Sequence, residues 1–206
     1  MSAALLMIDF QRDFCAEGGY SHRFAGLEWV KPILGPARRL LEAARRAGVL
    51  VVHTREGYAR DLSDCSPQKL ERSRKAGAEI GSRGPMGRLL IRGERGHDII
   101  DALAPIDGEI VIDKASYGAF CGTNCERILR ARGVDTLVFA GVTADVCVHT
   151  TLREAYDRWF SCIYVKDAIS CFDPEIRRAC EKMIEEEGGI WGSLTTVDAM
   201  VARWGG

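Results

Sequence analysis

The chain has 206 residues, enough for one domain with a well-buried core, and no Pro/Gly/Ser-rich stretch divides it in two. Its 28 Lys+Arg and 29 Asp+Glu leave a net charge of -1, so no overall field attracts nucleic acid or an acidic membrane surface. A basic leader segment and an apolar run of about 18 residues are both missing from the sequence, so we expect a cytoplasmic protein without nucleic-acid or membrane partners.

Eight cysteines are scattered along the chain. A domain of this size builds its core without disulfides, so we expect reduced thiols. Cys121 and Cys125 are four residues apart and resemble half of a metal site, but neither a second pair nor a nearby His completes a tetrahedral set. A structural zinc is therefore not expected.

Six apolar runs have the character of β-strands, and helical spacing fills most of the intervals between them. The predicted strands are Leu5–Ile8, Val49–His53, Ile110–Ile112, Leu137–Val142, Cys162–Val165 and a weaker one near Leu194–Val197. The predicted helices are Ile33–Ala44 with a stop at Gly48, Cys125–Ala131 before Gly133, Val146–Trp159, and Pro174–Glu186 capped by Asp173. Continuous apolar strands that alternate with helices predict a three-layer α/β fold with a parallel sheet.

The segment Glu56–Arg95 does not follow this alternation. It is rich in Arg, Gly, Ser and Pro, shows no sustained periodicity and is too long for a simple connection. We interpret residues 1–206 as one domain in which 56–95 forms a lid or an oligomer contact. Its basic residues are typical of a solvated surface, with a binding patch as the alternative.

Polar residues follow three of the predicted strands directly. Asp9 follows the first strand, Lys114 the third, and the turn Gly141-Val142-Thr143-Ala144-Asp145-Val146-Cys147 follows the fourth. Parallel sheets bind ligands beyond the carboxyl ends of their strands, where the strand order reverses. We therefore expect these side chains to form the functional site.

Cys147 lies in the first turn of a predicted helix, where the macrodipole and free backbone N–H groups favour a thiolate. The N–H groups of Thr143 and Cys147 can form an oxyanion hole there. The alternative for an isolated cysteine is a small buried side chain on an apolar helix. The combination of Asp9, Lys114 and Cys147 favours catalysis.

The order of these three residues resembles the isochorismatase-like cysteine hydrolases, which carry an Asp after strand one, a Lys after strand three and a Cys after strand four. The resemblance extends from Ile8-Asp9-Phe10-Gln11 to Gly188-Gly189-Ile190-Trp191-Gly192. It implies a six-stranded sheet of order 3-2-1-4-5-6, a cis peptide between Val142 and Thr143, and a homo-oligomer. Lys114 must then curl inward, because strand three lies two strands, or roughly 10 Å, from strand one.

The resemblance also implies a mechanism for breaking a C–N bond. Asp9 takes the thiol proton, Lys114 stabilises negative charge, and Cys147 attacks the carbonyl carbon to form a thioester. His149 lies two residues beyond the nucleophile and is expected to be structural. By the same resemblance, the expected substrate-binding residues are Phe14, Tyr117, Phe120 and Glu187.

Short shared stretches, such as His53-Thr54-Arg55-Glu56-Gly57, resemble the biuret-hydrolase branch and its ureide-cleaving relatives. Tyr117 and Glu187 stand where that branch carries Lys and Gln, which predicts neutral ureides such as biuret or triuret as substrates, although ordinary packing for Tyr117 and a solvated position for Glu187 remain open. His53 lacks a second ligand at metal spacing, so the resemblance implies neither metal nor cofactor. The alternatives are a ureidoacrylate or N-carbamoyl amidohydrolase, a nicotinamidase-like enzyme, and a catalytically silent binding scaffold.

Overall fold

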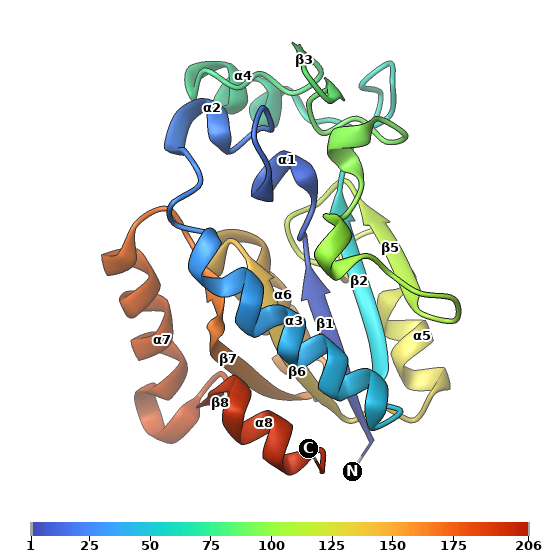
Figure 1. The fold of residues 1–206 in the computed structure, drawn as a ribbon, viewed down its shortest axis with the longest axis vertical. Helices are drawn as coiled ribbons and strands as arrows, with labels where there is room; N and C mark the ends of the chain where they lie inside the picture. Colours follow the sequence, from blue (N-terminus) through green and yellow to red (C-terminus); the bar gives the residue numbers. More distant parts are fainter. Residues whose placement is uncertain (1, 206) are drawn as a thin grey trace.

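The computed structural model describes residues 2–205, and its centre is a six-stranded parallel sheet with helices on both faces (Figure 1). The sheet strands are β1 (Ala3–Ile8), β2 (Leu50–Glu56), β5 (Ile110–Lys114), β6 (Thr136–Val142), β7 (Ser161–Ser170) and β8 (Ser193–Thr195). Their spatial order is β5-β2-β1-β6-β7-β8, and each neighbouring pair is parallel. The predicted class and strand order are confirmed.

The four predicted helices are also present. They are α3 (Lys31–Arg46), α5 (Cys125–Ala131), α6 (His149–Tyr156), which continues a π-helical turn η3 (Ala144–Val148), and α7 (Pro174–Gly189). The Asp173 carboxylate caps α7 by accepting the N–H of Glu175 at 2.7 Å. No helix within residues 2–205 is both long enough and apolar enough to cross a membrane.

Several short elements lie outside the predicted ones. These are α1 (Arg12–Cys15), α2 (His22–Ala25), α4 (Pro67–Lys75), α8 (Val197–Arg203), the hairpin β3 (Arg83–Gly84) and β4 (Gly87–Arg88), and the 3-10 turns η1 (Arg95–His97) and η2 (Asp101–Leu103). Most are one or two turns long, so they contain too few residues for a hydrophobic period to be recognised.

Alternation along the central strands divides the core into two layers. Leu5 and Met7 of β1 pack in one buried cluster with residues of α3 and α8, whereas Leu6 and Ile8 pack in the other with residues of α5, α6 and α7. In Figure 1, α3 crosses in front of β1 and β2, with α8 below it. Helices cover both faces of the sheet, and its carboxyl edge is at the top of the figure.

Residues 56–95 fold over that edge. Tyr58, Leu90 and Ile91 from this segment are buried in the main core, so the segment is packed against the sheet rather than extended from it. Within it, α4 starts with Ser66, whose hydroxyl accepts the N–H of Lys69 at 3.2 Å, and continues with Pro67 in its first turn. The sequence carries this start signal, but α4 buries only Ser73 and therefore lacks an apolar period. A contribution of the segment to an oligomer stays a prediction.

A buried carboxyl group fastens the segment to the sheet. Asp13 of α1 is 1% exposed, and its Oδ2 accepts the N–H of Leu90 at 2.8 Å. Burial raises the pKa of Asp13 to about 6, although the hydrogen bond from Leu90 and the charge of Arg23 oppose the rise. The folded protein therefore retains a proton on Asp13 at a pH at which the unfolded chain has released it.

The sign of the resulting pH dependence follows from this raised pKa. Between about pH 4 and pH 6 the folded state binds more protons than the unfolded state, so this group lowers the free energy of unfolding as the pH rises, by roughly 3 kcal/mol. Asp13→Asn still accepts the Leu90 N–H but cannot ionise. We expect the unfolding free energy of the parent, relative to Asp13→Asn, to fall by about that amount in urea titrations from pH 4 to pH 7. The control Asp107→Asn, at an exposed position outside the ion pairs found within residues 2–205, should follow the parent. Parallel pH curves for the parent and Asp13→Asn would contradict the assignment.

Candidate active site

The carboxyl ends of β1 and β6 meet at the centre of the sheet, where the strand order reverses. From β1 the chain proceeds outward to β2 and β5, and from β6 it proceeds in the opposite direction to β7 and β8. This divergence opens a crevice beyond the ends of the two strands. Helices α1, α2 and α4 lie above it in Figure 1.

A fully buried ion pair forms the floor of the crevice. Lys114 ends β5, two strands from β1, and its Nζ lies 2.8 Å from Oδ2 of Asp9, with both side chains 0% exposed. Nζ also donates to the carbonyl of Ser116 at 3.1 Å, so the loop after β5 curls inward as expected. Thr54 of β2 donates its hydroxyl to the other Asp9 oxygen at 2.5 Å. Burial by itself lowers the pKa of Lys114, but the negative groups around it outweigh this effect and raise it, so Lys114 is a cation.

Cys147 lies in the π-helical turn η3 that follows β6, and it is 5% exposed. Its Sγ lies 3.6 Å from Oε2 of Glu56, to which the thiol donates a hydrogen bond. A carboxylate oxygen of Asp9, one of Glu56 and the Cys147 sulfur all lie within 4.8 Å of one another. The three strand ends and the turn after β6 thus bring two carboxylates and an ammonium group to one thiol.

This environment corrects the expectation that the helix start favours a thiolate. Burial raises the pKa of Cys147 well above its ordinary value, and although Lys114 opposes the rise, the charges of Asp9 and Glu56 add to it. The resting group is therefore a protonated thiol. Its proton must pass to a neighbouring carboxylate before the sulfur becomes nucleophilic.

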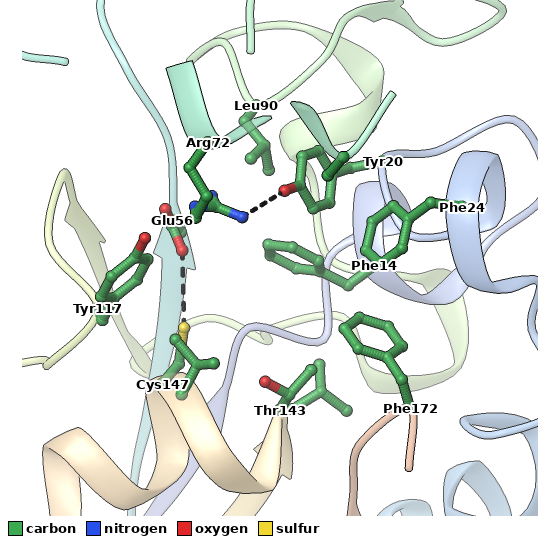
Figure 2. Close-up of a pocket in the computed structure, with 13 residues that line it drawn as sticks. Phe14, Tyr20, Phe24, Glu56, Arg72, Leu90, Tyr117, Thr143, Cys147 and Phe172 are labelled. Atoms are coloured by element: carbon green, nitrogen blue, oxygen red, sulfur yellow. Dashed lines mark hydrogen bonds between the residues drawn. The ribbon is translucent and has the colours of Figure 1, made fainter. Parts of the chain in front are cut away.

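A cavity of about 370 Å³ opens above the thiol. Figure 2 shows Cys147 at its floor, aromatic rings along one side, and Glu56 and Arg72 at the top. Its lining comprises Phe14, Tyr20, Phe24, Glu56, Arg72, Ala76, Leu90, Tyr117, Val142, Thr143, Val146, Cys147 and Phe172. Phe14, Tyr20, Phe24 and Phe172 contact one another edge to face, with ring centroids 5.0 to 5.9 Å apart. This wall of the cavity is therefore apolar and aromatic.

Most of the predicted site residues meet at this cavity. Cys147 lies at its floor, and the Asp9–Lys114 pair is buried next to the thiol without lining the cavity. The peptide between Val142 and Thr143 is cis, and Phe14 and Tyr117 line the walls. The role of the Thr143 and Cys147 N–H groups as an oxyanion hole stays a prediction.

Two predicted substrate-binding residues lie elsewhere. Phe120 is buried between helices, with its ring against Phe160 and beneath the Arg158 guanidinium. Glu187 is exposed in the kinked last turn of α7, just before β8 begins. A helix that connects two parallel strands ends near the amino edge of the sheet, so Glu187 lies at the edge opposite to the cavity. Neither residue lines the cavity, which corrects the expectation for both.

His149 is buried on α6 and accepts a hydrogen bond from Arg153 Nε at 3.0 Å. It does not line the cavity either. Its position agrees with the structural role expected for it.

Three charged residues at or next to the cavity were not predicted from the sequence. Glu56 ends β2, which continues three residues beyond its apolar run, so the same strand-end rule that selected Asp9 applies to it. Lys69 and Arg72 project from α4, and no pattern in the sequence identified that helix. Lys69 Nζ lies 3.3 Å from Glu56 Oε1 and 3.9 Å from the centroid of the Tyr117 ring. Arg72 Nη1 donates to the Tyr20 hydroxyl at 2.9 Å.

A family model described as Isochorismatase domain matches residues 3–195, nearly the whole chain. The chain belongs to the isochorismatase family. Among curated relatives, the ureidoacrylate amidohydrolase RutB of Rhizobium rhizogenes (strain K84) is 31% identical to this isochorismatase-family chain over 205 residues, which cover 97% of this chain and 82% of the relative.

Solved structures agree with this family and with the fold. A cysteine hydrolase from Pseudomonas syringae pv. phaseolicola 1448A has a TM-score of 0.82 at 27% identity, covering 98% of this chain and 92% of its own. The N-carbamoylsarcosine amidase from Thermoplasma acidophilum has a TM-score of 0.72 at 28% identity, covering 96% of this chain and 98% of its own. These comparisons establish the isochorismatase family and do not single out its biuret-hydrolase branch.

The site also contains a set of groups that could ligate a metal, namely Asp9, Glu56 and Cys147. Two ammonium groups already neutralise them, because Lys114 pairs with Asp9 and Lys69 with Glu56. His53, the histidine near the end of β2, points to the opposite side, where its Nε2 lies 2.9 Å from Glu109 Oε2. All eight cysteines are free thiols, and of the pair Cys121 and Cys125 only the first is exposed.

We therefore expect this isochorismatase-family protein to need no metal. A cation at the thiol would have to displace the Lys114 ammonium from a buried carboxylate, at a cost of several kcal/mol. Protein purified without added metal should contain well under one equivalent of zinc, manganese or iron by mass spectrometry. Dialysis against EDTA should leave both the melting temperature and the hydrolytic rate unchanged. Stoichiometric metal, or activity that EDTA removes and zinc or manganese restores, would contradict this expectation.

Proposed function

We propose that the chain is a cysteine amidohydrolase that cleaves the C–N bond of a small ureide through a thioester on Cys147. The single observation that carries this proposal is the thiol at the floor of the cavity, with the buried Asp9–Lys114 pair beside it. A thiol used only for packing has no need of two buried carboxylates and an ammonium group within reach, because burying charged groups costs free energy.

In the acylation half-reaction, Asp9 takes the thiol proton as the sulfur attacks the carbonyl carbon. Lys114 remains cationic and stabilises the negative charge that moves from the carboxylate to the sulfur. The N–H groups of Thr143 and Cys147 hold the oxyanion. The C–N bond then breaks, and Asp9 returns the proton to the leaving nitrogen.

In the deacylation half-reaction, water attacks the thioester carbon and Asp9 accepts one of its protons. The C–S bond breaks, and that proton restores the thiol. A ureide leaves its carbamoyl group on the sulfur, so hydrolysis releases carbamic acid, which decomposes to ammonia and carbon dioxide.

The substrate has a carboxylate at the end remote from the scissile bond. This refinement rests on Arg72, which lines the cavity and donates to a neutral phenol, the Tyr20 hydroxyl, rather than to a carboxylate. A guanidinium group held in this way can still bind a carboxylate through two parallel hydrogen bonds. The names of the relatives point in the same direction, since ureidoacrylate and N-carbamoylsarcosine are both ureides with a carboxylate.

One of the two observations behind the predicted preference for neutral ureides, the position of Glu187, no longer supports it. It depended on a negative charge from Glu187 and on the ring of Tyr117, and Glu187 lies at the opposite edge of the sheet. The ionised carboxylate that lines the cavity is Glu56, whose ion pair is with Lys69, and none of the ion pairs within residues 2–205 includes Arg72, although the charge of Glu56 acts on it from a distance. The charge argument therefore favours ureidoacrylate or an N-carbamoyl amino acid over biuret and triuret.

Removal of any one catalytic group should abolish turnover. We expect Cys147→Ala, Asp9→Asn and Lys114→Ala each to lower kcat by a factor of roughly 10³ or more, because the three groups act as one unit. Lys114→Ala also leaves a buried carboxylate unpaired, which costs about 3–5 kcal/mol of stability. The double variant Asp9→Asn with Lys114→Met removes both charges, so it should remain folded and inactive. If Cys147→Ala kept more than a few per cent of the rate, covalent catalysis would be wrong, and a parent inactive on every ureide tested would favour a binding scaffold.

Substrate charge is the next test. We expect kcat/KM of the parent to be higher for ureidoacrylate than for biuret or triuret. Arg72→Gln removes a charge-assisted hydrogen-bond pair with the carboxylate, so it should lower kcat/KM for ureidoacrylate at least tenfold and change kcat/KM for biuret by no more than about twofold. Arg74→Gln is the matched control, because Arg74 is on the same helix but pairs with Glu71 and Glu79 outside the cavity. A parent that prefers biuret, or an Arg72→Gln variant that loses both substrates equally, would remove the carboxylate from the proposal.

A further inference from the structure

Glu56 is a second carboxylate beside the nucleophile, and the proposed mechanism assigns it no task. It ends β2 and is 3% exposed. The side-chain amide of Gln11 holds its backbone on both sides, accepting the Glu56 N–H at 2.6 Å and donating to the Glu56 carbonyl at 2.8 Å. Gln11 is itself 0% exposed. The position of this carboxylate is therefore fixed by the fold.

Its two oxygens have different surroundings. Oε1 accepts the hydroxyl of Tyr58 at 2.5 Å and the ammonium of Lys69 at 3.3 Å. Oε2 receives only the weak hydrogen bond of the Cys147 thiol, at 3.6 Å, among the contacts recorded for residues 2–205. A carboxylate oxygen accepts two hydrogen bonds, so Oε2 keeps acceptor capacity toward the cavity that Glu56 lines.

The group is ionised in the resting site. Burial by itself raises the pKa of Glu56, but the charges of Lys114 and Lys69 and the hydrogen bond from Tyr58 outweigh this effect and hold it below its ordinary value. Oε2 is consequently an acceptor of charged hydrogen bonds, and an unpartnered one costs free energy when ligand replaces water above it.

Geometry decides which substrate atoms meet Oε2. When the sulfur bonds to a carbonyl carbon, the atoms attached to that carbon come within reach of a group 3.6 Å from the sulfur. The carbonyl oxygen accepts from the N–H groups of the oxyanion hole and does not face Oε2, since two acceptor oxygens would repel each other. The leaving nitrogen must face Asp9, which protonates it in the proposed mechanism. The third substituent stays on the acyl group, and it is an NH2 in a ureide and a carbon atom in a carboxamide.

We infer that Glu56 accepts a hydrogen bond from the NH2 of the substrate carbamoyl group and thereby selects ureides over carboxamides. This inference rests on the proposed function and deepens it by naming the residue that recognises the carbamoyl group of the substrate. An NH2 group donates a hydrogen bond to Oε2, whereas a methyl group or a ring leaves this buried carboxylate oxygen without a donor. Sites that hydrogen-bond a substrate group reject analogues that lack it much more strongly than apolar pockets distinguish sizes.

A pair of ligands of nearly equal shape isolates this contact. N-carbamoyl-β-alanine and N-acetyl-β-alanine share the carboxylate and the leaving amine and differ only by NH2 against CH3. Calorimetry on Cys147→Ala measures binding without turnover. We expect the carbamoyl ligand to bind at least about tenfold more tightly.

Glu56→Gln, introduced into Cys147→Ala, tests the residue itself. Tyr58 and Lys69 both donate to the position of Oε1, so the amide oxygen of Gln takes that place and its NH2 faces the cavity. A donor then meets the substrate donor, and the preference should fall to near one. Glu185→Gln, on the exposed surface of α7, is the control and should retain the full preference.

The outcomes separate the two proposals. Three outcomes would each overturn the role of Glu56. They are equal binding of both ligands to Cys147→Ala, no binding of either ligand at millimolar concentration, and a preference for the carbamoyl ligand that survives Glu56→Gln. Equal binding with rapid hydrolysis of the carbamoyl ligand by the parent would leave the proposed function standing alone. A strong, Glu56-dependent binding preference without hydrolysis by the parent would support the inference and refute the function.

Discussion

The ion pair between Asp9 and Lys114 is the interaction on which the site depends. Both side chains are fully buried, and they come from strands that are separated by β2. Two charges in such a place cost several kcal/mol each in lost hydration, and their mutual attraction offsets this cost only with good geometry and further hydrogen bonds. Thr54 supplies such a bond to Asp9, and the carbonyl of Ser116 supplies one to Lys114. The pair therefore requires the register of β1, β2 and β5 and the curl of the loop after β5.

The pair also determines the chemistry available to Cys147. Without Lys114, the Asp9 carboxylate could still accept the thiol proton, but the site would hold no positive charge to stabilise the thiolate. Without Asp9, the Lys114 ammonium could stabilise a thiolate but could not accept the thiol proton. Together they provide a base and a counter-charge in one contact. Because burial raises the pKa of the thiol, we expect Cys147 to become a nucleophile only after its proton has moved to a carboxylate. This arrangement protects a nucleophile that lies beneath an open cavity.

Much of the fold and of the candidate site could be predicted from the sequence. Continuous apolar strands and amphipathic helices give a parallel sheet, and the rule of strand carboxyl ends then selects Asp9, Lys114 and Cys147. Glu56 was missed because the predicted strand ended at His53, although the pairing of β2 with β5 continues to Glu56 itself. Glu187 was misplaced because its role was taken from the resemblance to the biuret-hydrolase branch, whereas the last turn of a crossover helix lies at the amino edge of the sheet. Lys69 and Arg72 could not be found by periodicity, since α4 turns hardly any apolar surface inward.

The origin of these residues separates catalysis from recognition. The strand ends and the turn after β6 supply the nucleophile, the ion pair and the two carboxylates, and their positions are fixed by the two core layers. The segment 56–95 supplies Lys69 and Arg72, on a helix that contributes little to either layer. Since Lys114 and Lys69 together lower the pKa of Glu56 and Lys69 lies on α4, the packing of α4 contributes to the charge balance beside the thiol. Changes in α4 can therefore alter the charge that the substrate meets, whereas changes at the strand ends would disturb the register that holds the ion pair.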